Sequence, residues 1–329
     1  MAVEAKKVVL EFEKPLAALE EQLEALRPKA EAGDADAAAE VAARERELEG
    51  RRAEVYAGLT AWDRVLLARH PDRPYTMDYV RRLIERPLEF HGDRLFRDDQ
   101  AILCGVGWFR GRKVVWMGHE KGRKTADKIR HNFGSPHPEG YRKALRVMRL
   151  AEKFGLPVLS FLDTAGAYPG IGAEERGQAE AIARNVLEMF NLHVPFVVAV
   201  IGEGGSGGAF GIGVGNRVLM QEYAYYSVIS PEGCAAILWR DRAYAPQAAA
   251  ALKITARDLL GLGVVDEIVE EPAYGAHRDH DRAAELLAEA LERHLAELEK
   301  MSGDELREDR RRKFLAMGFF EEGEKSGGD

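Results

Sequence analysis

Cysteine is scarce in this sequence: its 329 residues include only Cys104 and Cys234. The two lie far apart and neither belongs to a C-x-x-C pair, so the sequence predicts no structural zinc site and no bound metal. With so few cysteines, a framework of disulfide bonds is not expected either. This usage is typical of a protein in the reducing cytoplasm.

Long apolar runs are also missing. No stretch approaches the ~20 apolar residues that a membrane helix needs, and residues 1–14 lack the apolar run of a signal peptide. The formal net charge of −8 excludes nucleic-acid binding by bulk charge. Hydrophobic residues make up 46% and charged residues 31%, a balance that predicts a globular cytoplasmic protein without a membrane span.

The first sixty residues predict a helical arm. Leucines recur there with the 3-4-3 spacing that places them on one helical stripe. They are Leu16, Leu19, Leu23 and Leu26. Pro28 and Gly33–Asp36 are expected to interrupt this helix, and a second run follows with apolar residues spaced by heptads. These are Val41, Leu48 and Val55. We therefore expect a helical hairpin over residues 1–60 that packs on another part of the molecule.

Beyond residue 60 the pattern changes to short apolar runs bounded by glycine or proline, which predict buried strands. These runs are Val114–Met117, Pro157–Leu162, Pro195–Ile201 and Arg217–Met220. Helical stretches accompany them at Tyr141–Phe154, Glu174–Phe190 and Asp281–Lys300. The alternation predicts an α/β domain over residues 61–300. Residues 301–329 are expected to form a charged C-terminal tail, with disorder at the end of Glu321–Asp329.

The most informative segment is the glycine-rich stretch after the third apolar run. Five glycines lie between Gly202 and Gly208, interrupted by Glu203 and Ser206. Glycine lets the backbone approach a ligand closely, and amides at the start of a helix favour negative charge. The segment therefore predicts an oxyanion site. Tight packing of a strand against a helix is the simpler explanation.

Other functions fit parts of the same region. Gly204–Gly208 matches the G-x-S-x-G pattern of serine hydrolases, with Ser206 as nucleophile and an acid and a histidine further along. Asp266 with His277 or His280 would complete that triad. Asp163–Gly166 resembles the D-x-x-G motif of GTPases, but no correctly spaced phosphate loop precedes it. A subunit that only packs or assembles is a further alternative.

Several long and irregular strings resemble the alpha-subunit family of bacterial acetyl-CoA carboxylase carboxyltransferases. They are Ala68–Pro71, Lys128–Arg130, Asn132–Gly134, Pro138–Ala144, Asp163–Gln178, Gly202–Ala209 and Ser227–Ala235. The similarity covers nearly the whole chain, the helical arm included. One departure is Ala165, where the family usually has proline. Alanine there loosens the turn slightly and removes no hydrogen-bond donor.

The resemblance implies a crotonase-like fold, a spiral of ββα units, with the helical hairpin added at the N-terminus. It implies transfer of the carboxyl group from carboxybiotin to acetyl-CoA, which gives malonyl-CoA for fatty acid synthesis. The biotin-side oxyanion hole is expected at the amides of Gly207 and Gly208, with Ala209 beside them. Residues that shape the turn or its wall are Gly204, Gly205, Ser206, Gly166, Tyr168 and Gly170.

The resemblance also implies partners. Biotin would arrive on a biotin carboxyl carrier protein that a biotin carboxylase serves, and a zinc-bearing beta subunit would complete an α2β2 assembly. Lys121, Arg123 and Lys124 are candidates for contacts with the phosphates of CoA, because their charges suit phosphate oxygens.

Overall fold

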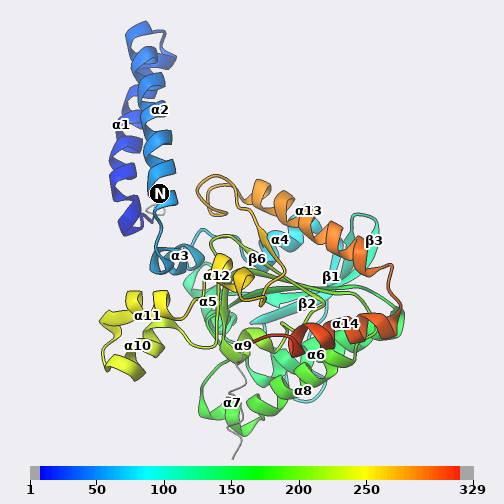
Figure 1. Ribbon diagram of the computed structural model, residues 1–329. Coiled ribbons are helices and arrows are strands. Elements are labelled where there is room, and N and C mark those ends of the chain that lie inside the picture. The colour runs from blue at the N-terminus through cyan, green and yellow to red at the C-terminus, as the bar shows by residue number, and fades with distance from the viewer. Residues whose placement is uncertain (1–7, 319–329) are drawn as a thin grey trace, which may run out of the picture.

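The computed structural model describes residues 8–318, and one mixed sheet forms its centre (Figure 1). The strand order is β1-β2-β3-β4-β5-β6-β8, and β7 pairs with the end of β5. The first three strands pair antiparallel and the others pair parallel. The bounds are β1 Glu85–Glu89, β2 Ile102–Phe109, β3 Arg112–His119, β4 Val158–Thr164, β5 Phe196–Gly205, β6 Arg217–Gln221, β7 Tyr225–Ser227 and β8 Glu267–Val269.

Helices cover both faces of this sheet (Figure 1). Their bounds are α1 Lys14–Glu31, α2 Ala35–Ala57, α3 Ala61–Ala68, α4 Thr76–Leu83, α5 Thr125–Arg130, α6 Pro138–Phe154, α7 Ile171–Glu175, α8 Gln178–Asn191, α9 Ser206–Phe210, α10 Pro231–Trp239, α11 Ala245–Ala251, α12 Ala256–Gly261, α13 His280–Leu298 and α14 Gly303–Leu315. Helices α6 and α8 pack on one face, while α4 and α13 pack on the other.

The four apolar runs that predicted strands lie in β3, β4, β5 and β6. Strands β4 and β5 are buried along their whole length, because helices lie on both of their faces. The stretch Glu174–Phe190 is not one helix as predicted: it is split between α7 and α8. Gly177 has φ +81° at the break, a left-handed conformation that glycine adopts without steric cost.

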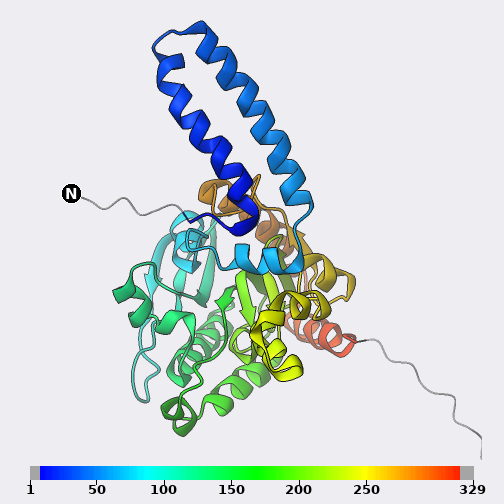
Figure 2. The same cartoon turned by 90° about the vertical axis from the view of Figure 1, so that its left-hand side faces the viewer.

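The predicted hairpin is confirmed. Helices α1 and α2 pack against each other and project from the domain (Figures 1 and 2). Leu16, Leu23 and Leu48 are buried in the cluster of apolar side chains at the arm. The expected break at Pro28 is wrong, because α1 continues to Glu31. Pro28 is exposed near the end of the helix, where water can replace the one hydrogen bond that proline removes.

The last described helix, α14, lies within the segment expected to be a charged tail. It packs on α8, and Arg310 is fully buried there. The Arg310 guanidinium donates hydrogen bonds to the carbonyls of Met189, Leu192 and Val194. These bonds replace its contacts with water. The predicted disorder in Glu321–Asp329 falls outside the described residues.

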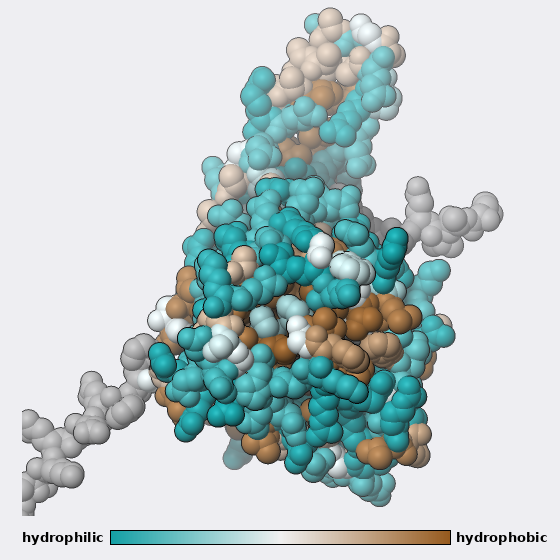
Figure 3. Space-filling model, turned by 90° about the vertical axis from the view of Figure 1, so that its right-hand side faces the viewer, coloured by the Kyte–Doolittle hydropathy of each residue, from teal (hydrophilic) through white to brown (hydrophobic). Residues whose placement is uncertain are grey.

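The surface around this fold is mainly hydrophilic on the side shown in Figure 3, where a hydrophobic area lies near the centre of the face. Figure 3 views the right-hand side of Figure 1. Among residues 8–318, no helix combines the length and the apolar character that crossing a membrane requires.

Candidate active site at the glycine turn

The glycine turn joins the end of β5 to α9, a helix of five residues. Gly205 is the N-cap, and Ser206 begins the helix with φ +53°. The first amides of a helix have no carbonyl partner within it. The amides that follow Gly205 are therefore available to bind negative charge at the mouth of the turn.

Most glycines of the turn are needed for packing. A Cβ atom at Gly205 would lie 2.3 Å from the Ala165 carbonyl oxygen, and one at Gly208 would lie 2.4 Å from the Ala167 amide nitrogen. Both distances are shorter than real Cβ contacts. The simpler explanation, close packing of backbone segments, therefore holds for these two positions.

Gly207 is different because it has room for a side chain. The nearest atom to an added Cβ is the Ile182 Cδ1 methyl at 3.9 Å, an ordinary van der Waals distance. Packing does not demand glycine here. The position also borders a cavity, so the free space at Gly207 faces a place where a ligand can bind.

This cavity has a volume of about 400 Å³. Ser206, Gly207 and Phe210 form its wall on the side of the turn, and Tyr226, Ser227 and Val228 form another. Apolar side chains complete the lining: Leu252, Ile254, Leu259 and Val264. An apolar pocket with helix amides at its mouth suits a ligand with an apolar body and one anionic atom.

A second wall of the turn comes from the segment after β4. Gly166 lies so close to Gly208 that a Cβ on Gly208 would meet its carbonyl carbon at 2.5 Å. Tyr168 is 38% exposed and is therefore not a core tyrosine. The centroid of its ring lies 4.2 Å from that of the His137 ring, with the two planes tilted by 38°, and a Cβ at Gly170 would lie 2.4 Å from the Tyr168 ring. The predicted wall residues are thus brought to the turn or to its flank.

Beneath the turn lies a buried network of charges. Glu203 in β5 accepts hydrogen bonds from Arg69 (2.7 Å), Lys121 (2.7 Å) and the Tyr225 hydroxyl (2.7 Å). Its amide donates to Asp163, which also pairs with Lys121 at 2.6 Å. Burial alone would raise the pKa of Glu203, but the charges of Lys121 and Arg69 lower that pKa to about 2. Glu203 is therefore an ionised anchor, not a general base.

Lys121 is part of this network and does not present its ammonium group to a phosphate. Burial opposes its charge, but Asp163 and Glu203 raise the pKa of Lys121 above its usual value. The structure thus corrects the expected phosphate contact at Lys121.

Arg123 and Lys124 lie elsewhere. Arg123 donates to the Asp78 carboxylate and to the Pro71 carbonyl (2.8 Å). Both residues line a separate cavity of about 570 Å³. Lys124 is exposed, so it is the member of the predicted trio best placed to meet a phosphate.

Sequence reasoning gave no role to Arg69 or Tyr225. Arg69 stands at the end of α3 and donates to Tyr225 as well as to Glu203. The one signal was the string Ala68–Pro71, which matched the family without indicating what its arginine contacts.

The serine hydrolase alternative lacks a base. No histidine of the described chain lines the cavity beside Ser206. His280 contacts the carbonyl of Asp72, and His277 lies 3.9 Å from Glu13 at the base of the arm. The GTPase alternative is not supported either. Asp163, the first residue of its D-x-x-G motif, is buried and paired with Lys121.

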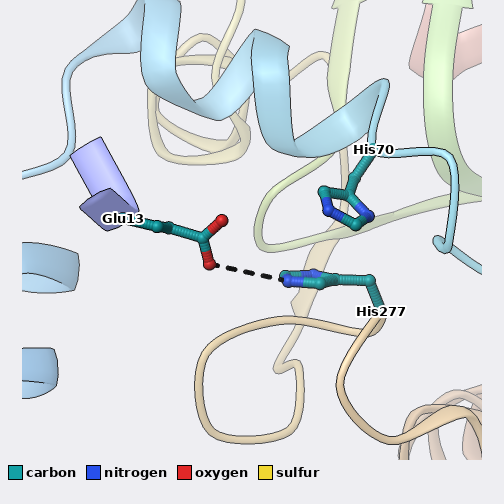
Figure 4. Close-up of side chains that lie close together, drawn as sticks. All are labelled: Glu13, His70 and His277. Carbon is teal, nitrogen blue, oxygen red and sulfur yellow. Dashed lines mark ion pairs between the residues drawn. The ribbon is translucent and has the colours of Figure 1, made fainter. Parts of the chain in front are cut away.

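A separate group of titratable side chains lies where the arm meets the domain (Figure 4). Glu13, His70 and His277 offer ligand atoms within 4.8 Å of one another. The Glu13 carboxylate lies 3.9 Å from His277 Nε2, and the centroids of the two histidine rings lie 4.3 Å apart with their planes tilted by 33°. Both His277 ring nitrogens are buried and have no hydrogen-bond partner among residues 8–318.

The existing contacts of this cluster disfavour a metal ion. Glu13 already forms an ion pair of 2.8 Å with Arg278, whose charge would repel a cation. His70 Nδ1 accepts from the Asp72 amide, so its Nε2–H donates to the Val8 carbonyl. A metal would displace these bonds. The cluster instead fastens the arm to the domain.

Comparison with known proteins decides the family. A family model described as acetyl co-enzyme A carboxylase carboxyltransferase-like matches residues 9–318. The chain belongs to this family. An acetyl-coenzyme A carboxylase carboxyl transferase subunit alpha from Syntrophotalea carbinolica is 54% identical over 95% of this chain and 99% of its own length. The alpha subunit from Thermus thermophilus is also 54% identical, over 95% and 99%.

The carboxyltransferase alpha subunit therefore belongs to an enzyme, acetyl-CoA carboxylase, whose product malonyl-CoA serves fatty acid synthesis. This confirms the function that the sequence resemblance implied. An alpha subunit works with other subunits of that carboxylase.

Solved structures of low identity share the fold. A Pseudomonas malonate decarboxylase hetero-tetramer in complex with coenzyme A gives a TM-score of 0.57 at 14% identity, over 73% of this chain and 95% of that chain. Transcarboxylase 12S gives 0.54 at 16% identity, over 78% of this chain and 45% of that chain. At such identities the likeness concerns the fold alone. It confirms the predicted crotonase-like α/β fold of the carboxyltransferase alpha subunit.

Proposed function

We propose that the glycine turn of this alpha subunit forms the biotin side of the carboxyltransferase site. Carboxybiotin on a carrier protein supplies the carboxyl group. Release of this group as CO2 leaves negative charge on the ureido oxygen of biotin. The amides of Gly207 and Gly208, with Ala209 beside them, stabilise that charge. The biotin anion then takes an α-proton from acetyl-CoA and becomes neutral biotin, and the resulting carbanion takes up the CO2 to give malonyl-CoA.

Preorganised backbone amides suit this task because they carry no charge of their own and need no reorientation. The observation that carries the proposal is Gly207: it has room for a side chain, yet it borders the cavity at the mouth of the helix. A side chain there would project toward a bound ligand. The apolar lining of the cavity fits the sulfur-containing ring and the aliphatic chain of biotin.

We place the second half of the site on a partner, the zinc-bearing beta subunit, in an α2β2 assembly in the cytoplasm. Hydrophobic side chains are exposed at the cavity and on the helix that follows it in the chain: Val228, which lines the cavity, is 79% exposed, and Ile237 and Leu238 of α10 are 71% and 65% exposed. Surfaces of this kind are typical of contacts with other subunits. The carrier protein and the biotin carboxylase would act at the assembled complex.

The test is the reverse reaction, carboxyl transfer from malonyl-CoA to free biocytin. It is measured with this chain alone, with the beta subunit alone and with both together. Activity in the mixture only is the expected result, since each chain would hold half of the site. A mixture that assembles by light scattering but transfers no carboxyl group would contradict the proposal.

A further inference from the structure

The carbonyl oxygen of Gly208 accepts hydrogen bonds from two buried side chains. The Tyr141 hydroxyl donates to it at 3.0 Å, and His119 Nε2 lies 3.3 Å away. Both side chains are fully buried. Tyr141 belongs to α6, and His119 ends β3, so two distant elements converge on one peptide group of the glycine turn.

The shortness of α9 leaves this carbonyl in need of donors. The Gly211 amide donates to Gly207, and the Ile212 amide donates to Ala209. The carbonyl of Gly208, between these two, is satisfied by side chains from outside the helix. A buried carbonyl requires such partners.

His119 is fixed as a donor at Nε2. The Asp163 amide lies 3.4 Å from His119 Nδ1 and donates to it, so the ring proton resides on Nε2. Burial lowers the pKa of His119 to about 3, which keeps the ring neutral near pH 7. Burial also raises the pKa of Tyr141, so its hydroxyl keeps its proton.

We infer that His119 and Tyr141 are positioning residues that hold the peptide groups around Gly208 in the orientation that anion binding requires. Glycine samples many backbone conformations, and the turn has glycine at both 207 and 208. Holding the Gly208 carbonyl toward the interior fixes the torsion angles between the Gly208 amide and the following peptide. In a trans peptide the N–H points opposite to the C=O, so the Ala209 amide is directed back toward the start of α9.

The two donors also polarise the peptide that they hold, because hydrogen bonds in a chain strengthen one another in a medium of low dielectric. This role rests on the proposed function of the turn. It differs from that function in assigning two side chains that do not touch the ligand.

The test uses variants that remove one donor each. Tyr141→Phe deletes only the hydroxyl. His119→Asn removes the Nε2 donor and keeps a polar atom near Nδ1, whereas His119→Gln places an amide nitrogen near the position of Nε2. We expect kcat of the assembled complex to fall about 10-fold in Tyr141→Phe and His119→Asn, less than for loss of an oxyanion-hole donor itself. The KM for biocytin should stay within about 2-fold, and His119→Gln should recover most of kcat.

Ser160→Ala is the matched control. The Ser160 hydroxyl is buried and donates to the Ile212 carbonyl at 2.7 Å, just beyond α9. Its loss removes the same kind of bond without touching the Gly208 peptide. It should lower the melting temperature and leave kcat unchanged. If the Tyr141 and His119 variants also lose only melting temperature, both residues are structural and the inference is wrong.

A second readout does not depend on catalysis. Hydrogen–deuterium exchange of the peptide that contains Gly207 and Gly208, measured on the full chain, should be faster in Tyr141→Phe than in wild type or Ser160→Ala. Unchanged exchange would overturn the positioning role. If the wild-type complex transfers no carboxyl group but exchange responds as expected, the proposed function is wrong. The structural role of Tyr141 and His119 in ordering the turn is then still supported.

Discussion

Arg69 and Glu203, separated by 134 positions in sequence, form an ion pair of 2.7 Å directly beneath the glycine turn. The pair joins the end of α3 to the strand that leads into the turn. Lys121 contacts the other oxygen of the same carboxylate, so two cations share one buried anion. The stability of the turn therefore depends on a residue that never meets the ligand.

Replacing Glu203 with glutamine should destabilise the chain strongly. The variant removes one of the two carboxylates that pair with Lys121 and one of the two that pair with Arg69, which leaves only Asp163 and Glu232 to balance them. Breaking a buried ion pair in this way costs about 3–5 kcal/mol. The free energy of unfolding, measured by urea denaturation, provides the check. Glu45→Gln is the control: Glu45 pairs with Arg27 at the exposed surface of the arm, where both side chains are about half exposed. That change should cost less than about 1 kcal/mol.

The contribution of Glu203 should also depend on pH. Its pKa is about 2 in the folded chain, below its ordinary value of 4.5. The stabilisation is therefore complete above about pH 4.5 and is lost as the pH falls toward 2. Unfolding curves of wild type and Glu203→Gln between pH 6 and pH 3 should converge as the pH falls. A constant gap over that range would contradict the assignment.

Gly207 and Gly208 should respond differently to a side chain, although they are neighbours of the same type. Gly207→Val has room beside Ile182, so the protein should fold and assemble while carboxyl transfer falls at least about 100-fold, as expected when an oxyanion site is blocked. Gly208→Ala should instead reduce folded protein, because its methyl group would meet the Ala167 amide at 2.4 Å. Circular dichroism, assembly with the beta subunit and turnover together separate the two effects. Wild-type turnover in Gly207→Val would show that the amides of the glycine turn are not part of the oxyanion hole.

Ser206 should prove to be a spacer. We expect Ser206→Ala to keep turnover within about 2-fold, since a true nucleophile would cost several orders of magnitude. A fluorophosphonate probe should not label Ser206, because no described histidine lines its cavity. Covalent labelling at this serine would revive the hydrolase alternative.

Sequence reasoning worked best where the signal was local. The glycines of 202–208 predicted the turn, and continuous apolar runs predicted the central strands, because each depends on residues close in the chain. Pro28 and the stretch around Gly177 misled the helix bounds, since a proline near an exposed helix end is tolerated and one left-handed glycine divides a helical pattern.

Pairings across the fold had no such signal. Lys121 appeared in a basic segment and was assigned to phosphate, but the fold places Glu203 and Asp163 beside it. Likewise, nothing in the sequence indicates that Tyr141 and His119 both contact the Gly208 carbonyl. Residues that act through a contact 40 or more positions away become visible only when the topology brings their elements together.

His119 supplies the remaining prediction, a loss of stability at mildly acidic pH. Its pKa is about 3 in the folded chain against an ordinary value of 6.5. Between these values the unfolded chain binds the proton and the folded chain does not, so stability falls as the pH drops below about 6.5. The effect should reach about 2 kcal/mol at pH 5. His119→Gln keeps a donor near Gly208 and cannot titrate, so the variant should gain stability relative to wild type from pH 7 to pH 5. Other histidines titrate equally in both proteins and cancel in this comparison, which urea denaturation at each pH measures. A difference between the two proteins that does not change with pH would mean that His119 is not held neutral in the fold.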